Sequence, residues 1–505
     1  MWECVIESQL SPEPYTGRAN KLASTIARRI EADIVGRGWP IGASLGSEHA
    51  LQQRFRVSRS VLREAVRLVE HHQVARMRRG PNGGLLICEP NAGPATRAVV
   101  IYLEYLGATL GDLLNARLVL EPLAASLAAE HIDEAGIGRL RAVLRAEENW
   151  KPGLPPPRDE FHIALAEQSK NPVLQLFIDV LMRLTARYAR KARTDSATEA
   201  VEAIDHMHND QWQIVAAVTA GDSARAKTLS ERHVEAVTAW LQAHYPGDDA
   251  GRNGLTRRGV AASRAREPRF DPEAPRGKLA EVLAATIGDE IAGSGWQVGS
   301  VFGTETALLE RYRVSRAVLR EAVRLLEYHS VAQMRRGPGG GLIVTKPQPQ
   351  ASIDTIALYL QYRKPSREDL RCVRDAIEID NVAKVVKRRT ESEVAAFLDA
   401  SRPLLDDNPQ GTAGDVRKAA VEEFRFHVGL AQLAGNALLD LFLRIIVELF
   451  RRHWSSIGQA LPTWDDVVAV ERAHLRILEA IAAGDDSLAR YRIRRHLDAA
   501  ASWWL

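Results

Sequence analysis

The segment VSRSVLREAVRLVEHHQVARMRRGPNGGLLI at residues 57–87 occurs a second time, as VSRAVLREAVRLLEYHSVAQMRRGPGGGLIV at residues 314–344. The two segments are identical at 23 of 31 positions, so they indicate an internal duplication rather than a shared composition. Each contains a Ser-Arg start, an amphipathic stretch rich in arginine, and two short apolar stretches around a glycine-rich turn. This order predicts a helix followed by a β-hairpin, twice in one chain.

The length and charge of the chain limit the classes of protein to which it can belong. At 505 residues it is long enough for about three or four domains, and its 46% hydrophobic and 26% charged residues are typical of a globular protein. The net charge is only +3, but residues 54–79 contain eight arginines and two acidic residues, and residues 311–336 contain seven and two. Such basic stretches in a balanced protein predict contacts with phosphate groups.

Cysteine usage and hydropathy predict a cytoplasmic protein without membrane contact. The three cysteines lie far apart and form no Cys-x-x-Cys pair (Cys4, Cys88 and Cys372), which argues against a disulfide framework or a thiolate zinc site. The first 20 residues lack the basic and apolar regions of a signal peptide. The most apolar later stretch, residues 437–450, is interrupted by three charged residues, so we do not expect it to cross a membrane.

The duplication extends over most of the chain and predicts two similar units of two domains each. Arg117 and Arg374 lie 257 residues apart, and His162 and His427 lie 265 apart, so the second copy has gained residues between these positions. We predict a mainly α fold in which each winged helix-turn-helix precedes an all-α bundle. The predicted boundaries are a tail (1–17), a first winged helix-turn-helix (18–90), a first bundle (91–245), a flexible linker (246–277), a second winged helix-turn-helix (278–347) and a second bundle (348–505).

Periodicity predicts the elements of the first winged helix-turn-helix. Apolar residues recur every four positions from Leu22 to Ile34, which indicates a helix over 18–36 that ends near Gly36. Further helices are expected from Ser47 to Phe55 and from Ser58 to His71, with Ser58 as a helix cap. Residues 74–77 and 85–87 flank the turn RRGPNGG and predict a two-stranded hairpin, and residues 89–94 a short linker.

The arginine-bearing helices are the predicted DNA-reading elements. Arg59 and Arg63 are four apart, as are Arg316 and Arg320, so each pair projects from one helical face and can grip guanine in the major groove. The alternative interpretation of each arginine-bearing helix is a basic, solvent-exposed surface helix without a DNA-binding role. The full set of predicted DNA contacts is Ser58, Arg59, Ser60, Arg63, Arg78, Arg79, Gly80, Gly83, Ser315, Arg316, Arg320, Arg335, Arg336, Gly337 and Gly340.

These motifs resemble the winged helix of the GntR family of bacterial transcription regulators. The resemblance rests on Gly46-Ser47-Glu48, the run from Val57 to Val66 and the turn RRGPNGG, and the second copy matches it from Val314 to Val323. The helical partner domains resemble the FCD domain of the FadR-type subfamily. One departure concerns a DNA-contacting arginine that the family often has near the second helix, where this chain has His49 and Thr306. This predicts that the two half-sites differ.

The second bundle contains a candidate metal site. Glu423 and His427 are four apart on one predicted helix, and His474 and His496 lie on two later helices. One carboxylate and three imidazoles would suit Zn²⁺, Ni²⁺, Mn²⁺ or Fe²⁺, although separate core histidines are the alternative. The resemblance to FCD domains implies that these four residues form the metal site, with Glu423 in place of the usual aspartate.

The first bundle departs from that pattern, and we expect no metal there. His162 and His233 match the family positions, but Arg158 takes the carboxylate position and Gln211 takes the middle histidine position. A cation beside the metal position is electrostatically unfavourable. Asp159 and His208 are the nearest possible substitutes, and the preferred interpretation is a degenerate pocket kept for packing and dimer-like contacts.

An arginine and an acid on the first helix of each bundle complete the list of candidates. By the family resemblance Arg374, followed by Glu378, is the candidate effector contact for a small carboxylate. An acyl-CoA is the alternative effector. The competing interpretation of Arg117/Glu121 and Arg374/Glu378 is a surface ion pair at i,i+4 spacing.

Together these features predict a ligand-responsive transcription repressor. One chain carries both reading heads and could fill a pseudo-palindromic operator as an intramolecular pseudo-dimer, or act as a homodimer of the fused chain. An architectural DNA-binding protein without effector is a rival hypothesis. A metal-dependent enzyme is the other, but no nucleophile motif, paired catalytic carboxylates or phosphate-binding loop supports it.

Overall fold

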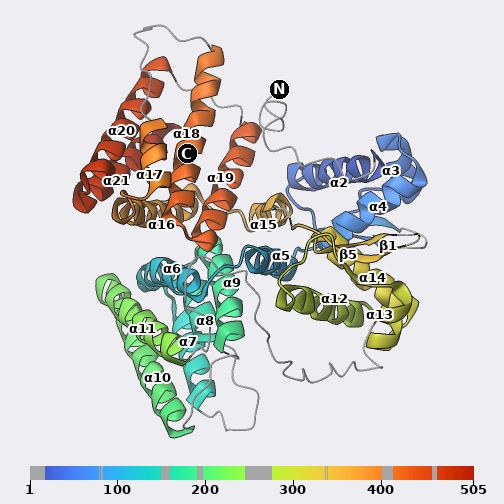
Figure 1. The fold of residues 1–505 in the computed structure, drawn as a ribbon, viewed down its shortest axis with the longest axis horizontal. Coiled ribbons are helices and arrows are strands. Elements are labelled where there is room, and N and C mark those ends of the chain that lie inside the picture. Colours follow the sequence, from blue (N-terminus) through green and yellow to red (C-terminus); the bar gives the residue numbers. More distant parts are fainter. Residues whose placement is uncertain are drawn as a thin grey trace. The chain divides into compact units, whose positions relative to one another are not determined.

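The computed structural model describes residues 18–78, 80, 83–148, 160–189, 197–244, 276–335, 337, 339–347, 349–400, 413–457 and 463–504 (Figure 1). The chain forms two compact units, Met1–Ala95 and Thr96–Leu505. The predicted tail and nearly all of the predicted linker lie outside the described residues.

The first unit contains the segment that we call head 1, residues 18–90. It comprises α2 (Arg18–Gly36), α3 (Glu48–Phe55), α4 (Arg59–His71), β1 (Ala75–Arg78) and β2 (Gly84–Ile87). The helices form where periodicity predicts them, and Ser47 and Ser58 are helix caps whose side chains accept the backbone N–H of Ala50 and Val61. Ile26 and Ile30 are buried against α4, whereas Leu22, expected on the same apolar face, is 45% exposed.

The segment that we call head 2, residues 276–347, belongs to the second unit and repeats this order of elements. It contains α12 (Arg276–Gly293), β3 (Val301–Gly303), α13 (Glu305–Tyr312), α14 (Arg316–Tyr328), β4 (Ala332–Arg335) and β5 (Gly341–Val344). Thr304 and Ser315 cap α13 and α14 as Ser47 and Ser58 cap their counterparts. The buried core joins α12, α13, α14 and the strands around Leu283, Leu319 and Leu342.

The sheet of head 2 differs from the two-stranded hairpin that the sequence predicts. Its strand order is β3-β5-β4, because residues 301–303 pair with the free edge of β5. In head 1 the same position forms a single bridge between Ser44 and Leu86. Gly341 has a φ of 150°, and a Cβ there would lie 2.6 Å from the Gly303 carbonyl oxygen, so only glycine permits this close approach.

Two helical bundles make up the rest of the second unit, except that residues 92–95 at the start of the first bundle fall in the first unit. Among the described residues the bundles contain no strand. We call residues 92–244 bundle 1: α5 (Ala92–Tyr105), α6 (Leu110–His131), α7 (Glu134–Glu148), α8 (Glu160–Gln168), α9 (Pro172–Ala189), α10 (Ala197–Thr219) and α11 (Ser223–His244). We call residues 349–504 bundle 2: α15 (Pro349–Arg363), α16 (Arg367–Lys387), α17 (Ser392–Ala400), α18 (Ala413–Ala434), α19 (Ala437–Ile457), α20 (Trp464–Ala483) and α21 (Asp486–Trp504). The prediction of all-helical bundles is therefore confirmed in the described residues.

The start of bundle 1 corrects the predicted linker. Ala92, Gly93 and Pro94 form the first turn of α5, although the sequence placed them in the short linker. Proline is tolerated in the first turn because its missing N–H has no partner within the helix there. The Asn91 side chain accepts the Gly93 N–H at 2.6 Å and so holds this turn.

The two bundles contact each other reciprocally, because equivalent residues of each bundle bind equivalent helices of the other. Helix α16 packs against α6 and α9, and α19 packs against α6 (Figure 1). Asn171 donates its side-chain N–H to the Asp369 carbonyl oxygen at 2.9 Å, and Asn436 donates to the Asp112 carbonyl oxygen, also at 2.9 Å. Between them the rings of Phe177 and Phe442 stack at 4.0 Å, and both are fully buried. This exchange of contacts is what a two-fold related pair of bundles produces.

Asn171 and Asn436 also cap their own helices, which makes them testable stability determinants. Each side-chain oxygen accepts two backbone N–H groups at the start of α9 or α19. Replacing Asn171 with alanine removes a cap and one hydrogen bond between the bundles, so we expect the free energy of unfolding to fall by about 1–3 kcal/mol. Denaturant unfolding monitored by circular dichroism measures it. A fall below 0.5 kcal/mol, with Asn436→Ala behaving likewise, would contradict the role.

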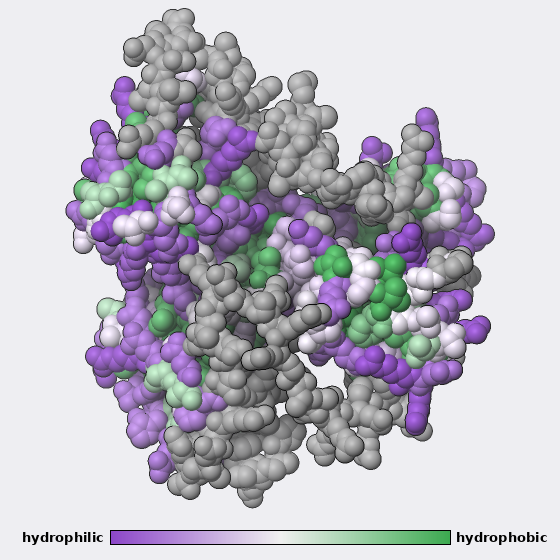
Figure 2. Space-filling model, in the orientation of Figure 1, coloured by the Kyte–Doolittle hydropathy of each residue, from purple (hydrophilic) through white to green (hydrophobic). Residues whose placement is uncertain are grey.

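The surface of the described residues is largely hydrophilic. Figure 2 shows hydrophobic residues on the visible face as small areas, including some over head 2. The exposed large hydrophobic residues are Leu22, Ile41, Leu106, Val282, Val298, Val301 and Tyr491. None of the helices in the described ranges combines the length and hydropathy needed to cross a bilayer.

Candidate DNA-binding heads and metal centre

The arginines of head 1 predicted to contact DNA lie exposed at the start of α4. Arg59 and Arg63 both bind the same carboxylate oxygen of Glu48, at 3.0 and 2.7 Å. The pKa of Glu48 is lowered most by the hydrogen bond from Arg63 and next by the hydrogen bond from Arg59. The two guanidinium groups are therefore held side by side on one face, beside the Ser58 cap, whose hydroxyl lies 3.0 Å from that of Ser60.

Head 2 has the equivalent pair of arginines, but among the described residues they are not bound to a shared glutamate. Arg316 and Arg320 lie exposed on α14 behind the cap Ser315, and the counterpart of Glu48 is Glu305. Within the described part of the chain, no ion pair joins Glu305 to either arginine. His49 and Thr306, which replace the arginine often found in the family, are both exposed on the preceding helices α3 and α13. The two heads thus differ in the ion pairing of otherwise equivalent arginines.

The hairpins bring further predicted contacts to the surface. Arg78 and Arg335 are exposed at the ends of β1 and β4, and the following glycines, Gly80 and Gly337, have φ values of 101° and 102°. Gly83 and Gly340 close these turns by donating their N–H to the carbonyl oxygens of Gly80 and Gly337, at 2.9 and 2.8 Å. The predicted contacts Arg79 and Arg336 lie outside the described residues.

Glu48 provides a test of the difference between the heads. Replacing Glu48 with glutamine removes a negative charge beside Arg59 and Arg63, so we expect DNA affinity to rise by up to about fivefold, the size of an exposed ion pair. The matched variant Glu305→Gln should raise it less, because Glu305 forms no described ion pair with the arginines of α14. Fluorescence anisotropy at a fixed salt concentration measures both. Equal effects would contradict the inferred asymmetry.

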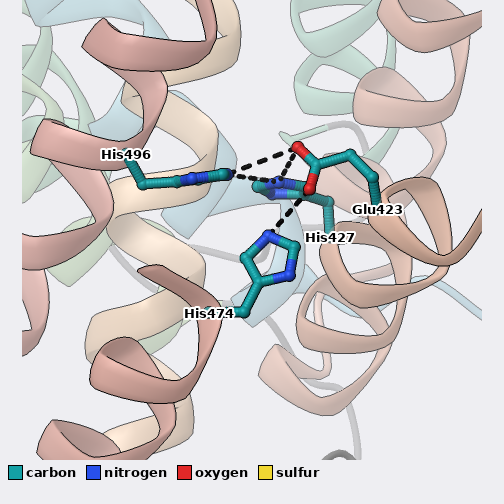
Figure 3. A group of neighbouring side chains, drawn as sticks. All are labelled: Glu423, His427, His474 and His496. Atoms are coloured by element: carbon teal, nitrogen blue, oxygen red, sulfur yellow. Dashed lines mark hydrogen bonds and ion pairs between the residues drawn. The ribbon is translucent and has the colours of Figure 1, made fainter. Parts of the chain in front are cut away.

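The four predicted metal ligands of bundle 2 converge at one buried point. Glu423 and His427 come from α18, His474 from α20 and His496 from α21, and their ligand atoms all lie within 4.8 Å of one another (Figure 3). His427 Nε2 lies 3.1 Å from Glu423 Oε1 and 3.1 Å from His496 Nε2. His474 Nε2 lies 2.8 Å from Glu423 Oε2. The side chains of all four residues point toward one another, as Figure 3 shows.

The buried carboxylates in and beside this cluster favour a positive charge between them. Burial alone would raise the pKa of Glu423, but His427 and His474 hold it well below its usual range. Burial would lower the pKa of His427, yet Glu378 and Glu423 raise it to about 9. Burial lowers the pKa of His474 to about 4 despite Glu423. A proton on His427 therefore balances the carboxylates, in a place where a cation could do the same.

The donor set fits a divalent metal ion. In a tetrahedral site with bonds of about 2.0–2.1 Å, ligand nitrogens lie about 3.3–3.4 Å apart. The separations within the cluster, 3.1 Å between His427 and His496 and 3.4 Å between His496 and Glu423, are close to that value. His474 Nε2 and Glu423 Oε2 are buried without a well-oriented hydrogen bond, so both have capacity for a ligand bond.

The arginine–acid pairs of both bundles are buried, which overturns the surface ion pair as an interpretation. Arg117 is 1% exposed and Arg374 is 9% exposed, and their partners Glu121 and Glu378 are buried as well. In each pair the arginine Nε donates to a carboxylate oxygen at 2.5 Å. Arg374 thus lies within the core of bundle 2, with Glu378 joining it to His427.

Comparison with known families agrees with this geometry. The FCD domain description matches residues 112–236 and 369–499, within the two bundles and over about half of the chain. The description of bacterial regulatory proteins of the gntR family matches residues 22–81, within head 1. The chain belongs to the FCD-domain regulators of the gntR family. Head 1 is accordingly a GntR-type DNA-binding domain, and both bundles are FCD domains.

Individual relatives are about half as long as this chain. The HTH-type transcriptional regulator LutR of Bacillus subtilis is 28% identical over 209 residues, which are 40% of this chain and 94% of LutR. The Uxu operon regulator of Haemophilus influenzae is 26% identical over 44% of this chain and 82% of its own length. A solved GntR structure from Streptococcus agalactiae is 21% identical, covers 43% of this chain and 99% of its own, and has a TM-score of 0.30. The two sequence relatives are named as regulators rather than enzymes.

The first FCD domain keeps only part of the ligand set. Its His162 and His233 stack at 5.2 Å, as His427 and His496 do in the second. Burial lowers the pKa of His233 to about 3, and neither of its ring nitrogens has a hydrogen-bond partner among the described residues. The possible substitute His208 is directed to Glu148 on α7, at 3.2 Å.

Other residues of the first FCD domain bear on the same prediction. Gln211 is half-buried at the position that corresponds to His474, and Arg158 and Asp159 lie outside the described residues. The described residues of this domain form no cluster of three or more metal-ligating side chains.

Two features of these sites were not predicted. The sequence shows Glu378 four residues after Arg374, but it does not show that Glu378 also reaches His427 on another helix. Nor does it show that Asn171 contacts the opposite FCD domain. In both cases the missing information is the packing of one helix on another, which local spacing does not contain.

Proposed function

We propose that the chain is an effector-responsive repressor that reads a pseudo-palindromic operator with both heads. Head 2 is then a second winged helix of the same kind as head 1. The observation that carries this proposal is the repetition of a serine-capped arginine helix, with Arg59 and Arg63 in one head and Arg316 and Arg320 in the other. Exposed arginines at the start of a helix are suited to guanine edges in the major groove.

The two FCD domains supply the arrangement that relatives of half this length would obtain by pairing two chains. Reciprocal contacts from Asn171 and Asn436 support an intramolecular pseudo-dimer, because each domain offers the other the same surface. A single chain can then fill both half-sites, and the linker raises the effective concentration of the second head. A homodimer of the fused chain is the alternative assembly.

Footprinting combined with native mass spectrometry tests this proposal. Genomic fragments that the protein binds are first selected and then footprinted with the full chain. We expect protection of two half-sites about one helical turn apart by one chain per operator. Protection of a single half-site per chain, with a second chain required for the other, would contradict the intramolecular reading of the operator.

The proposed sensor is the second FCD domain, which would hold a divalent ion through Glu423, His427, His474 and His496. Such an ion supplies a Lewis-acidic positive charge that can bind a carboxylate oxygen. Arg374, buried beside the cluster, is proposed to orient a small carboxylate effector, because guanidinium groups bind carboxylates through paired hydrogen bonds. Effector binding would alter the geometry of the heads and weaken operator binding.

A thermal-shift screen of the metal-loaded chain tests the sensor. We expect a small organic carboxylate to raise the melting temperature and to release the operator in a gel-shift assay. Stabilisation by acyl-CoA esters and not by small carboxylates would replace the proposed effector class. Operator binding that no compound of either class alters would favour the architectural DNA-binding protein.

A further inference from the structure

We propose that Glu378 is a positioning residue that sets both the ring of His427 toward the metal centre and the guanidinium of Arg374 beside it. This role rests on the metal site of the proposed function. It is distinct from that of the four ligands, because Glu378 is not among the residues whose ligand atoms converge within 4.8 Å of one another. It connects the metal ligands on α18 with the effector candidate on α16.

The contacts of Glu378 leave neither of its oxygens unused. Oε2 accepts a hydrogen bond from Nδ1 of His427, and Oε1 accepts one from Nε of Arg374 at 2.5 Å. Glu378 and His427 are 3% and 2% exposed, so water does not compete for these bonds. One carboxylate therefore binds two different functional side chains, one with each oxygen.

The bond to His427 determines which ring nitrogen is available. An imidazole that donates Nδ1–H to a carboxylate carries its lone pair on Nε2 and becomes a stronger ligand. In this structure Nε2 of His427 faces Glu423 Oε1 and His496 Nε2, both at 3.1 Å. The orientation that Glu378 imposes is thus the orientation that metal binding through Nε2 requires.

The bond to Arg374 gives the same carboxylate a second effect. The hydrogen bond from Nε to Glu378 holds one edge of the planar guanidinium in place. A shift of Glu378 on metal binding would also move the guanidinium of Arg374, because both hydrogen bonds are made by one rigid carboxylate group. The metal and effector positions are therefore joined by one residue.

The first FCD domain offers a matched control for this inference. Glu121 binds Arg117 Nε at 2.5 Å and His162 Nδ1 at 2.7 Å, and it is buried like Glu378. Its domain lacks a cluster of four ligands among the described residues. Both domains therefore contain a buried arginine, glutamate and histidine that contribute to stability. A metal ion that the histidine would bind is expected only in the second domain.

The experiment compares Glu378→Gln with Glu121→Gln in the full chain, using Zn²⁺ as the probe. Competition with a chromophoric chelator gives the affinity, and thermal unfolding of the metal-free variants gives their stability. We expect Glu378→Gln to weaken zinc binding about 10- to 100-fold, since loss of such an outer partner typically has that effect, and Glu121→Gln to change it less than twofold. Both variants should lose similar stability.

A spectroscopic readout separates positioning from general destabilisation. With Co²⁺ in place of Zn²⁺, we expect the visible absorption bands to shift in Glu378→Gln and to be unchanged in Glu121→Gln, because only the former alters the bound imidazole. Unchanged affinity and spectrum in Glu378→Gln would overturn the positioning role. A wild-type chain that binds neither ion would instead overturn the metal site itself, and the DNA-binding part of the proposed function would be judged separately by footprinting.

Discussion

Replacing Arg316 and Arg320 together with alanine is expected to weaken specific operator binding by about 30- to 10⁴-fold. Each arginine that grips a guanine edge contributes about 1–3 kcal/mol of discrimination, and about 1.4 kcal/mol corresponds to a factor of ten. Both side chains are exposed at the start of α14, so their loss should leave the core of head 2 intact. Gel shifts with specific and scrambled duplexes at one salt concentration measure the effect.

A surface-arginine control and a variant of the other head make this result interpretable. Arg490→Ala removes a partly exposed arginine from α21, far along the chain from either head, and should leave operator binding unchanged. Arg59→Ala with Arg63→Ala should produce a loss of similar size through the other half-site. Wild-type affinity in the Arg316/Arg320 double variant would show that α14 does not read the operator.

Replacing His496 with alanine is expected to remove stoichiometric metal from the chain. If about 10–16 kcal/mol of binding free energy is shared by four ligands, each supplies about 3 kcal/mol, and its loss weakens binding on the order of 100-fold. His496 is buried and its Nε2 lies 3.1 Å from His427 Nε2, so its replacement deletes one of the four converging ligand atoms. Elemental analysis after dialysis should fall from about one ion per chain to a small fraction.

His233→Ala is the matched control for this loss. His233 occupies the equivalent place in the first FCD domain, is equally buried, and stacks on His162 in the same way. Its replacement should leave the metal content unchanged while creating a comparable cavity. Loss of metal in both variants would place an ion in the first domain also, and retention in both would show that His496 is not a ligand.

The sequence predicts the parts of this fold that local chemistry determines. Ser58 and Ser315 mark helix starts because a hydroxyl at that position accepts an unpaired backbone N–H. The four members of the metal cluster could be selected from residue type and family resemblance, and the structure brings all four together. Their role in binding a metal stays a proposal.

What the sequence could not give depends on contacts between elements. An arginine and a glutamate four residues apart look the same on a surface helix and in a core, so the burial of Arg117 and Arg374 could not be deduced from spacing. Strand β3 has only three residues and forms because β5 offers an open edge, which is a property of the folded head. The first turn of α5 was hidden by Gly93 and Pro94, whose usual place is a loop.

The stacked rings of Phe177 and Phe442 have a genetic consequence. A regulator assembled from separate copies exchanges subunits, so an altered copy combines with normal ones and disables them. Here the contact is made between two segments of one polypeptide, and its formation does not depend on how abundant the protein is in the cell. On the proposed intramolecular reading of the operator, defects in the arginines of α4 and α14 are expected to be recessive in a partial diploid, where the same defects in a two-chain regulator would be dominant.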